Sequence, residues 1–198
     1  MGYRFPLKTG GEGESRPLFK SQLPTIENRQ AIGFLDLVEL LFIKAFRGFG
    51  VPLPTIRKAA IKASQRWKTE HPFCLNRFST DGLSIFATLT DESGDPQLLQ
   101  LVESQYCFAN VINPYLKQLD YDHYGDVSRW WPLGKNKPVL VDPKLSFGRP
   151  VIDHLFIPTE ALYQAVKIND SEVEVASWFG VSTSLVRAAV EFEKSLVA

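Results

Sequence analysis

The spacing of hydrophobic and polar residues differs from one part of the chain to another. Residues 33–47 form the most apolar stretch. Four polar side chains within about 140° of a helical wheel interrupt this stretch: Asp36, Glu39, Lys44 and Arg47. So broad an apolar circumference predicts a helix that is covered on two sides. We expect a homodimer in which Leu37, Leu41 and Phe46 contribute to a shared core. Burial at the centre of a single chain is the alternative, and we weigh it equally.

A second helix is predicted after Gly48-Phe49-Gly50, with Thr55 as its N-terminal cap. Its apolar stripe consists of Ile56, Ala59, Ala60, Ala63 and Trp67. Basic side chains, among them Arg57 and Lys58, occupy the remaining face. Such a face is either simply solvated or contacts nucleic-acid phosphates.

The first 31 residues predict a β-hairpin and a linker. Apolar residues alternate at Tyr3, Phe5 and Leu7, a glycine-rich loop occupies residues 9–15, and a second apolar run follows at residues 17–19. Basic side chains flank the loop at Arg4, Lys8, Arg16 and Lys20. They belong either to a loose N-terminus with solvated charges or to a wing that lies along DNA phosphates.

From Phe73 the pattern favours strands. Residues 73–78 and 83–89 predict a hairpin around the turn at residues 79–82, and further strands are expected at residues 98–102, 127–133 and 139–141. A short helix is expected at residues 109–118. Within the strand at 127–133, Trp130 and Trp131 would point to opposite faces, one into the core and the other toward a partner.

Three helices are predicted at the C-terminal end, at residues 159–167, 171–179 and 182–196, after an irregular segment at residues 143–153. Ala176, Gly180 and Val186 have the spacing of a helix-turn-helix, in which a small residue, a glycine with positive φ and an apolar residue let two helices cross. This helix pair is rich in glutamate and poor in cations. An acidic helix pair favours a protein partner over DNA.

Composition limits the class of protein. The chain has 198 residues, of which 44% are hydrophobic and 22% are charged, as is usual for a folded globular protein. No apolar run approaches the ~18 residues that span a bilayer. Two cysteines, Cys74 and Cys107, do not make a disulfide scaffold, so we expect a cytoplasmic protein. The net charge is zero, but residues 1–70 hold 12 Lys and Arg against 6 Asp and Glu, whereas the rest of the chain is acidic.

Candidate catalytic chemistry is sparse. Asp120, Asp122 and Asp126 would share one face of an alternating strand, but His123 would not. A polar strand edge with a turn explains this cluster better than a metal site does. No glycine-rich phosphate loop followed by Lys and Ser or Thr is present. We therefore predict no enzymatic activity, no metal and no cofactor.

The C-terminal part resembles the small antitoxin-associated family known as domain of unknown function 433. The resemblance covers about residues 138–194 and rests on four segments: Val141-Asp142-Pro143, Ser146-Phe147-Gly148-Arg149-Pro150-Val151-Ile152, Ile157-Pro158-Thr159 and the helix pair around Ala176 and Gly180.

Two segments near the front of the chain are Gly33-Phe34-Leu35-Asp36-Leu37-Val38-Glu39-Leu40 and Gly50-Val51-Pro52-Leu53-Pro54-Thr55-Ile56-Arg57. They resemble the second half of a MerR-like winged-helix region. Together with His71-Pro72-Phe73 and residues 129–134, the order of segments is similar to long VapB-type antitoxins of bacterial toxin–antitoxin operons. This resemblance implies a PIN-domain ribonuclease as the toxin and autorepression of the operon. Family members usually begin with a helix-turn-helix before the wing, whereas this chain starts inside the wing, so we expect the helix that reads the major groove to be absent. In addition, His154, Leu155 and Phe156 replace the family's usual Gly-Thr-Arg.

We therefore expect an α+β protein of three modules. Residues 1–72 would form a partial winged-helix region with a dimer helix, residues 73–134 a small α+β middle domain, and residues 135–198 a C-terminal helix-turn-helix-like antitoxin module. The expected function is the antitoxin of a type II system, and the alternatives are a DNA-binding regulator without a toxin and a purely structural dimer. The side chains expected to bind the partner are Trp130, Trp131, Phe147, Arg149, Phe156 and Trp178.

Overall fold

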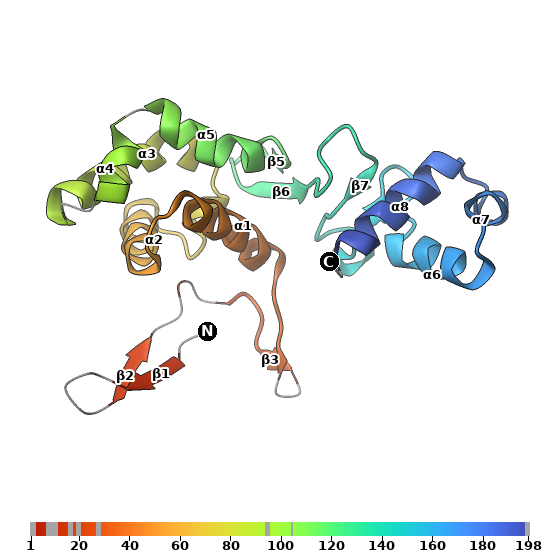
Figure 1. Cartoon of the computed structure of the whole chain (residues 1–198), viewed down its shortest axis with the longest axis horizontal. Helices are drawn as coiled ribbons and strands as arrows, with labels where there is room; N and C mark the ends of the chain where they lie inside the picture. Colours follow the sequence, from red (N-terminus) through yellow and green to blue (C-terminus); the bar gives the residue numbers. More distant parts are fainter. Residues whose placement is uncertain are drawn as a thin grey trace. The chain divides into compact units, whose positions relative to one another are not determined.

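The computed structural model describes residues 3–6, 12–15, 18, 21–26, 29–93, 96–103 and 105–196. Side chains are described for these except residues 3–6, 12–15, 26, 29–30, 91–93, 96–98 and 105–106. The chain divides into two compact units, Met1–Asn113 and Pro114–Ala198, and the division falls inside one helix (Figure 1). The three predicted modules are a different division and stay a prediction. No helix among the described residues is long and apolar enough to cross a membrane.

The first unit consists of two short hairpins followed by helices. Its strands pair antiparallel, β1 with β2 and β3 with β4. Its elements are β1 (Tyr3–Pro6), β2 (Glu12–Ser15), β3 (Thr25–Ile26), β4 (Arg29–Gln30), α1 (Phe34–Phe49), α2 (Leu53–Trp67), η1 (Pro72–Cys74), α3 (Phe78–Ser93), α4 (Pro96–Val102) and α5 (Gln105–Leu116).

Aromatic rings fill the core of this unit. Six phenylalanines from α1, η1, α3 and α5 are buried and pack ring against ring: Phe42, Phe46, Phe73, Phe78, Phe86 and Phe108. The ring centroids of Phe46 and Phe86 are 4.7 Å apart. Phe46 is fully buried by its own chain, so it offers no surface to a second subunit, whereas Leu37 and Leu41 are half-buried. A homodimer through Leu37 and Leu41 stays a prediction.

Two buried carboxylates of α1 fasten the segments on either side of it. Asp36 accepts hydrogen bonds from the Ser21 hydroxyl at 3.0 Å and from the backbone of Gln22 and Gly33 at 3.1 and 2.9 Å. One turn later, Glu39 accepts a hydrogen bond of 2.8 Å from the Phe73 backbone N–H. Asp36 and Glu39 are polar residues of a largely apolar helix, and both side chains face inward because each accepts hydrogen bonds from buried backbone N–H groups.

Residues 78–93 and 96–102 are helical, and the predicted strands at 73–78, 83–89 and 98–102 are wrong. The buried positions of α3 are Phe78, Gly82, Ile85, Phe86, Leu89 and Thr90, which is a helical period rather than an alternation. Gly82 is not a turn residue. A Cβ there would lie 2.8 Å from Cε2 of Phe78 and 2.9 Å from Cζ of Phe108, so the glycine lets two rings approach the helix.

The other elements predicted for the first unit are present, but a helix cap and a strand boundary differ from the prediction. The first helix and the basic second helix are confirmed, and Ile56, Ala59, Ala60 and Ala63 are buried as expected. The cap of α2 is Pro52 rather than Thr55. The N-terminal hairpin is present, but β2 begins at Glu12, inside the segment predicted as a loop. The β3–β4 hairpin was not predicted.

The second unit begins within α5 and combines short strands with a three-helix group. Its strands pair β5 with β6 and β7 with β8, and the backbones of Trp130 and Val141 link the two pairs. The three helices were all predicted, with ends within two residues of those observed. The elements are β5 (Leu119–Tyr121), β6 (Val127–Trp130), β7 (Val139–Leu140), η2 (Ser146–Gly148), β8 (Val151–Ile152), α6 (Thr159–Asn169), α7 (Glu172–Phe179) and α8 (Thr183–Ser195).

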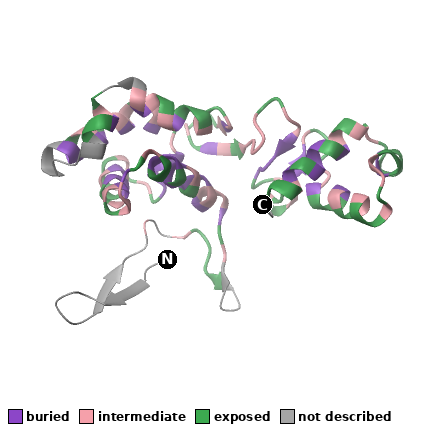
Figure 2. Cartoon of the chain, viewed as in Figure 1, coloured by how far each residue is buried: buried purple, intermediate pink, exposed green. Residues whose placement is uncertain are grey.

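The core of the second unit lies along one side of α8 (Figure 2). Val186, Ala189 and Phe192 of α8 are buried together with residues of α6, α7, β7 and β8. Between α7 and α8, Gly180 has φ +65°, and Ala176 and Val186 are buried. The positive φ of Gly180 and the burial of Ala176 and Val186 are the features that the spacing of these three residues predicted for a tight pair of helices.

The buried Glu39 predicts a pH-dependent stability. Burial raises the pKa of Glu39 to about 8, with a smaller contribution from Asp36, and hydrogen bonds from the backbone of Phe73 and Cys74 offset only part of it. When folding raises the pKa of an acid, the free energy of unfolding is highest at pH values below the pKa of that group in the unfolded chain. It falls as the pH rises from there through the pKa of the group in the folded protein. The free energy of unfolding should therefore fall by roughly 1 kcal/mol per pH unit between pH 7 and 8.

Chemical denaturation of Glu39→Gln at pH 7 and pH 8 checks this expectation. The amide can still accept from Phe73 but cannot ionise, so the decline should disappear. The exposed Glu103 is the matched control, and Glu103→Gln should keep the wild-type decline. Equal pH dependence in wild type and Glu39→Gln would show that Glu39 is not the titrating group.

Candidate partner-binding surface

Two adjoining turns of the second unit have unusual backbone geometry. In the first turn, Ser146, Phe147 and Gly148 have φ values of +46°, +58° and +76°. In the second, His154 and Phe156 have φ values of +66° and +56°. Residues other than glycine rarely adopt this conformation, and each such residue costs about 1 kcal/mol or more. Four of them within eleven residues indicate that the surrounding structure holds both turns in place.

Hydrogen bonds within the unit provide that support. The Gly148 N–H donates to the Leu145 carbonyl at 2.8 Å, and the Phe156 N–H donates to the Ile152 carbonyl at 2.9 Å. The Ser146 hydroxyl lies 3.5 Å from the carbonyl oxygen of Phe156, so the two turns touch. We call residues 145–149 and 153–156 together the aromatic tip.

Asp142 and Thr159 fix the two ends of this segment. The carboxylate of Asp142 is buried, accepts the Lys144 N–H at 2.8 Å and pairs with Nε of Arg129 at 3.0 Å. At the other end, the Thr159 N–H donates to the carbonyl of Pro150 at 3.0 Å, and the Thr159 hydroxyl donates to Glu193 of α8. The tip is therefore anchored to β6 on one side and to α8 on the other.

Apolar side chains at the tip face solvent. Phe147 is fully exposed, and Phe156 and Leu155 are exposed by 50% and 45%. Arg149 and Lys144 are also exposed, and neither forms an ion pair within the described part of the chain. Phe147, Arg149 and Phe156 were predicted to bind a partner, and the structure places them on two turns that meet where the Ser146 hydroxyl approaches the Phe156 carbonyl. Their role in binding stays a prediction. The left-handed backbone was not predicted; Gly148 was the one residue in the sequence that signalled it.

A second group of exposed apolar side chains lies on α7 and at the end of α6. It consists of Ile168, Val173, Trp178 and Phe179. At about 100° per residue, Val173, Trp178 and Phe179 point to different sides of α7, so they do not form one continuous face. Trp178 was predicted to bind a partner, and it is 62% exposed. Exposed Glu174 also lies on α7, and Glu172 of α7 pairs with Arg187 of α8 at 3.2 Å.

Trp130 and Trp131 are held inside the unit. The indole N–H of Trp130 donates to Oε1 of Gln118 at 3.2 Å, and that of Trp131 donates to Oδ2 of Asp120 at 2.8 Å. Both side chains are half-buried. Neither is fully buried and neither is exposed, so the expectation of one core tryptophan and one exposed tryptophan is wrong. Partner binding through either ring stays a prediction.

The acidic cluster near residue 120 belongs to a hairpin turn. Asp122 accepts the backbone N–H groups of Tyr124 and Asp126 at 2.9 and 3.0 Å. Although burial of Asp120 opposes it, hydrogen bonds from Lys135 and Trp131 lower the pKa of Asp120. The carboxylates are thus engaged in turn and strand contacts. No group of three or more His, Cys, Asp or Glu side chains within the described residues is arranged to hold a metal ion.

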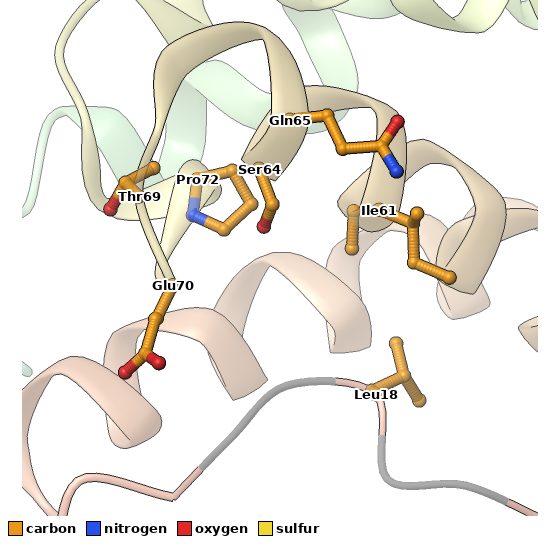
Figure 3. Close-up of a pocket in the computed structure, with 8 residues that line it drawn as sticks. Leu18, Ile61, Ser64, Gln65, Thr69, Glu70 and Pro72 are labelled. Atoms are coloured by element: carbon orange, nitrogen blue, oxygen red, sulfur yellow. The ribbon is translucent and has the colours of Figure 1, made fainter.

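An open groove of about 570 Å³ lies in the first unit (Figure 3). Residues of α2, of the segment after it and Leu18 line this groove: Leu18, Ala60, Ile61, Ser64, Gln65, Thr69, Glu70 and Pro72. The lining is mostly apolar and contains no nucleophile paired with a base. It includes none of the predicted functional residues.

The basic residues predicted to contact DNA are only partly described. Lys8, Arg16 and Lys20 lie outside the described residues, as does the side chain of Arg4. Lys58 is exposed on α2, and Arg57 is half-buried. The structure therefore shows a basic helix face at α2.

No family model matches this chain. The chain is 24% identical over 172 residues to a protein of Mycobacterium tuberculosis (strain ATCC 25618 / H37Rv) named "Putative antitoxin VapB45", covering 80% of this chain and 70% of that protein. It also resembles the crystal structure of Rv2018 from Mycobacterium tuberculosis, with a TM-score of 0.70, 23% identity and coverage of 88% and 85%. The second likeness concerns the fold alone. The first supports a VapB-type antitoxin.

Proposed function

We propose that this chain is the antitoxin of a type II toxin–antitoxin pair and acts by covering its toxin. The observation that carries the proposal is the exposed apolar surface of the second unit, in a chain that is similar over 80% of its length to a VapB-type antitoxin. Monomeric proteins rarely expose several aromatic side chains together without a use for them. Protein–protein occlusion requires such a surface and needs no catalytic group.

The proposed toxin is a PIN-domain ribonuclease, as the resemblance of the sequence implies. Residues 158–198 hold three Lys and Arg against six Asp and Glu, so this part of the chain suits the cationic path along which a ribonuclease binds RNA. The aromatic tip suits an apolar pocket instead. Both contacts would block access of RNA to the toxin.

Operon autoregulation is the second part of the proposal, and a regulator that acts without a toxin is the alternative. The basic face of α2, on which Lys58 is exposed, favours DNA binding. This helix lies within the first 70 residues of the chain, which carry an excess of six positive charges. Because these contacts are to phosphates, they position the protein on DNA without reading its sequence.

Co-expression with a PIN-domain ribonuclease encoded beside this chain tests the antitoxin proposal. The full chain should restore growth, and the purified complex should cleave RNA at least tenfold more slowly than the toxin alone. The same toxin co-expressed with an empty vector is the control. A PIN-domain neighbour that stays toxic and active in the presence of the full chain would favour the regulator.

Salt dependence tests the DNA proposal. Affinity for duplex DNA should fall steeply as salt rises, because each phosphate contact adds roughly 0.9 to the log–log slope. Replacing Lys8, Arg16, Lys20 and Lys58 with alanine should weaken binding to all sequences alike, as measured by fluorescence anisotropy. Loss of binding in Arg187→Ala, with the quadruple variant unaffected, would move the DNA contact to α8.

A further inference from the structure

The backbone conformation of the aromatic tip destabilises the folded unit, and the exposed ring of the tip makes no packing contact that compensates for it. Phe147 combines a left-handed backbone with a fully exposed ring, so it contributes neither favourable dihedrals nor buried area. Local rules of this kind are commonly broken where a protein binds or reacts. The tip has no catalytic chemistry, so binding is the remaining explanation.

The backbone of the tip is already in place before any partner arrives. Asp142, Thr159 and the hydrogen bonds of the two turns hold it. A rigid aromatic anchor loses little conformational entropy on binding, and such pre-organisation raises affinity. By contrast, Trp178 projects from an eight-residue helix that is exposed along much of its length.

Charge identifies the kind of surface that fits the tip. Lys144 and Arg149 lie on either side of Phe147 in the sequence, and within the described residues neither cation has a carboxylate partner. Of the carboxylates nearest to them in sequence, Asp142 pairs with Arg129, and Asp153 faces Nε2 of His154 at 2.8 Å. The tip therefore carries exposed apolar side chains together with unpaired cations, although the C-terminal segment as a whole is acidic. A complementary surface has an apolar pocket with carboxylates at its rim.

We propose that the aromatic tip is the principal anchor for the toxin, with Phe147 and Phe156 entering an apolar pocket and Lys144 and Arg149 facing carboxylates around that pocket. This inference rests on the proposed antitoxin function. It differs from the expectation drawn from the sequence, in which an acidic surface carried the contact.

The test measures the affinity of the full chain for the purified PIN-domain toxin by isothermal titration calorimetry, together with inhibition of RNA cleavage. The double variant Phe147→Ser, Phe156→Ser should weaken binding about 100-fold, since truncating a central anchor commonly costs tenfold or more. Arg149→Glu should weaken binding and reduce its dependence on salt. The matched control is Tyr124→Ser, an exposed aromatic of the turn between β5 and β6, which should bind within threefold of wild type. Trp178→Ser tests α7 as the competing contact.

Thermal unfolding separates binding from folding. Because Phe147 is fully exposed, Phe147→Ser alone should unfold at the wild-type temperature and should weaken binding about tenfold. Unchanged affinity in the tip variants, or a loss confined to Trp178→Ser, overturns the inference while leaving the antitoxin proposal intact. Absence of binding by the wild-type chain overturns both.

Two further outcomes would assign the tip to another occupant. If light scattering shows a wild-type dimer that the double variant converts to a monomer, with toxin affinity unchanged, the tip binds a second copy of this chain. If Arg149→Glu weakens binding to duplex DNA and leaves toxin affinity unchanged, the cations of the tip contact phosphates. Either result contradicts the proposal.

Discussion

The buried hydroxyl of Thr159 is the contact on which the second unit's surface most depends. It lies where α6 begins, donates to Glu193 of α8, and its backbone N–H holds the carbonyl of Pro150. One residue thus ties the helical core to the strand that leads into the aromatic tip. Together with the packing of Ile152 against α8, that tie holds the segment between the left-handed turns against their intrinsic preference. The backbone that carries the exposed rings is therefore pre-organised rather than mobile.

The two units use polar side chains in the same way. In the first unit, Asp36 and Glu39 are buried on α1 and satisfy backbone donors of the flanking segments. In the second, Asp142 accepts the Lys144 N–H, and Thr159 donates to the Pro150 carbonyl and to Glu193. In each case a polar residue within an apolar stretch gives the fold a fixed connection, which apolar packing alone does not provide.

Sequence patterns predicted the helices of the second unit well and those of the middle of the chain badly. The C-terminal helices have recognisable boundaries, such as the Ser171 cap and Gly180 with its positive φ. Residues 78–93 contain Thr, Ser and Gly in a stretch that resembles a strand and a turn, and the helix forms because Phe78, Ile85 and Phe86 pack against other rings. The exposure of Phe147 was predictable as an excess of apolar side chains in a small module. Its backbone conformation was not, because it depends on contacts between distant parts of the chain, such as those of Asp142 with Arg129 and of Thr159 with Glu193.

The central claim is that the second unit covers a toxin through the aromatic tip, and hydrogen exchange on the complex tests it most directly. Amide exchange of the full chain is compared with and without the purified PIN-domain toxin. The account predicts that binding slows exchange chiefly at residues 143–157, with little change in the first unit. Protection confined to residues 1–113, with residues 143–157 unchanged, would contradict it.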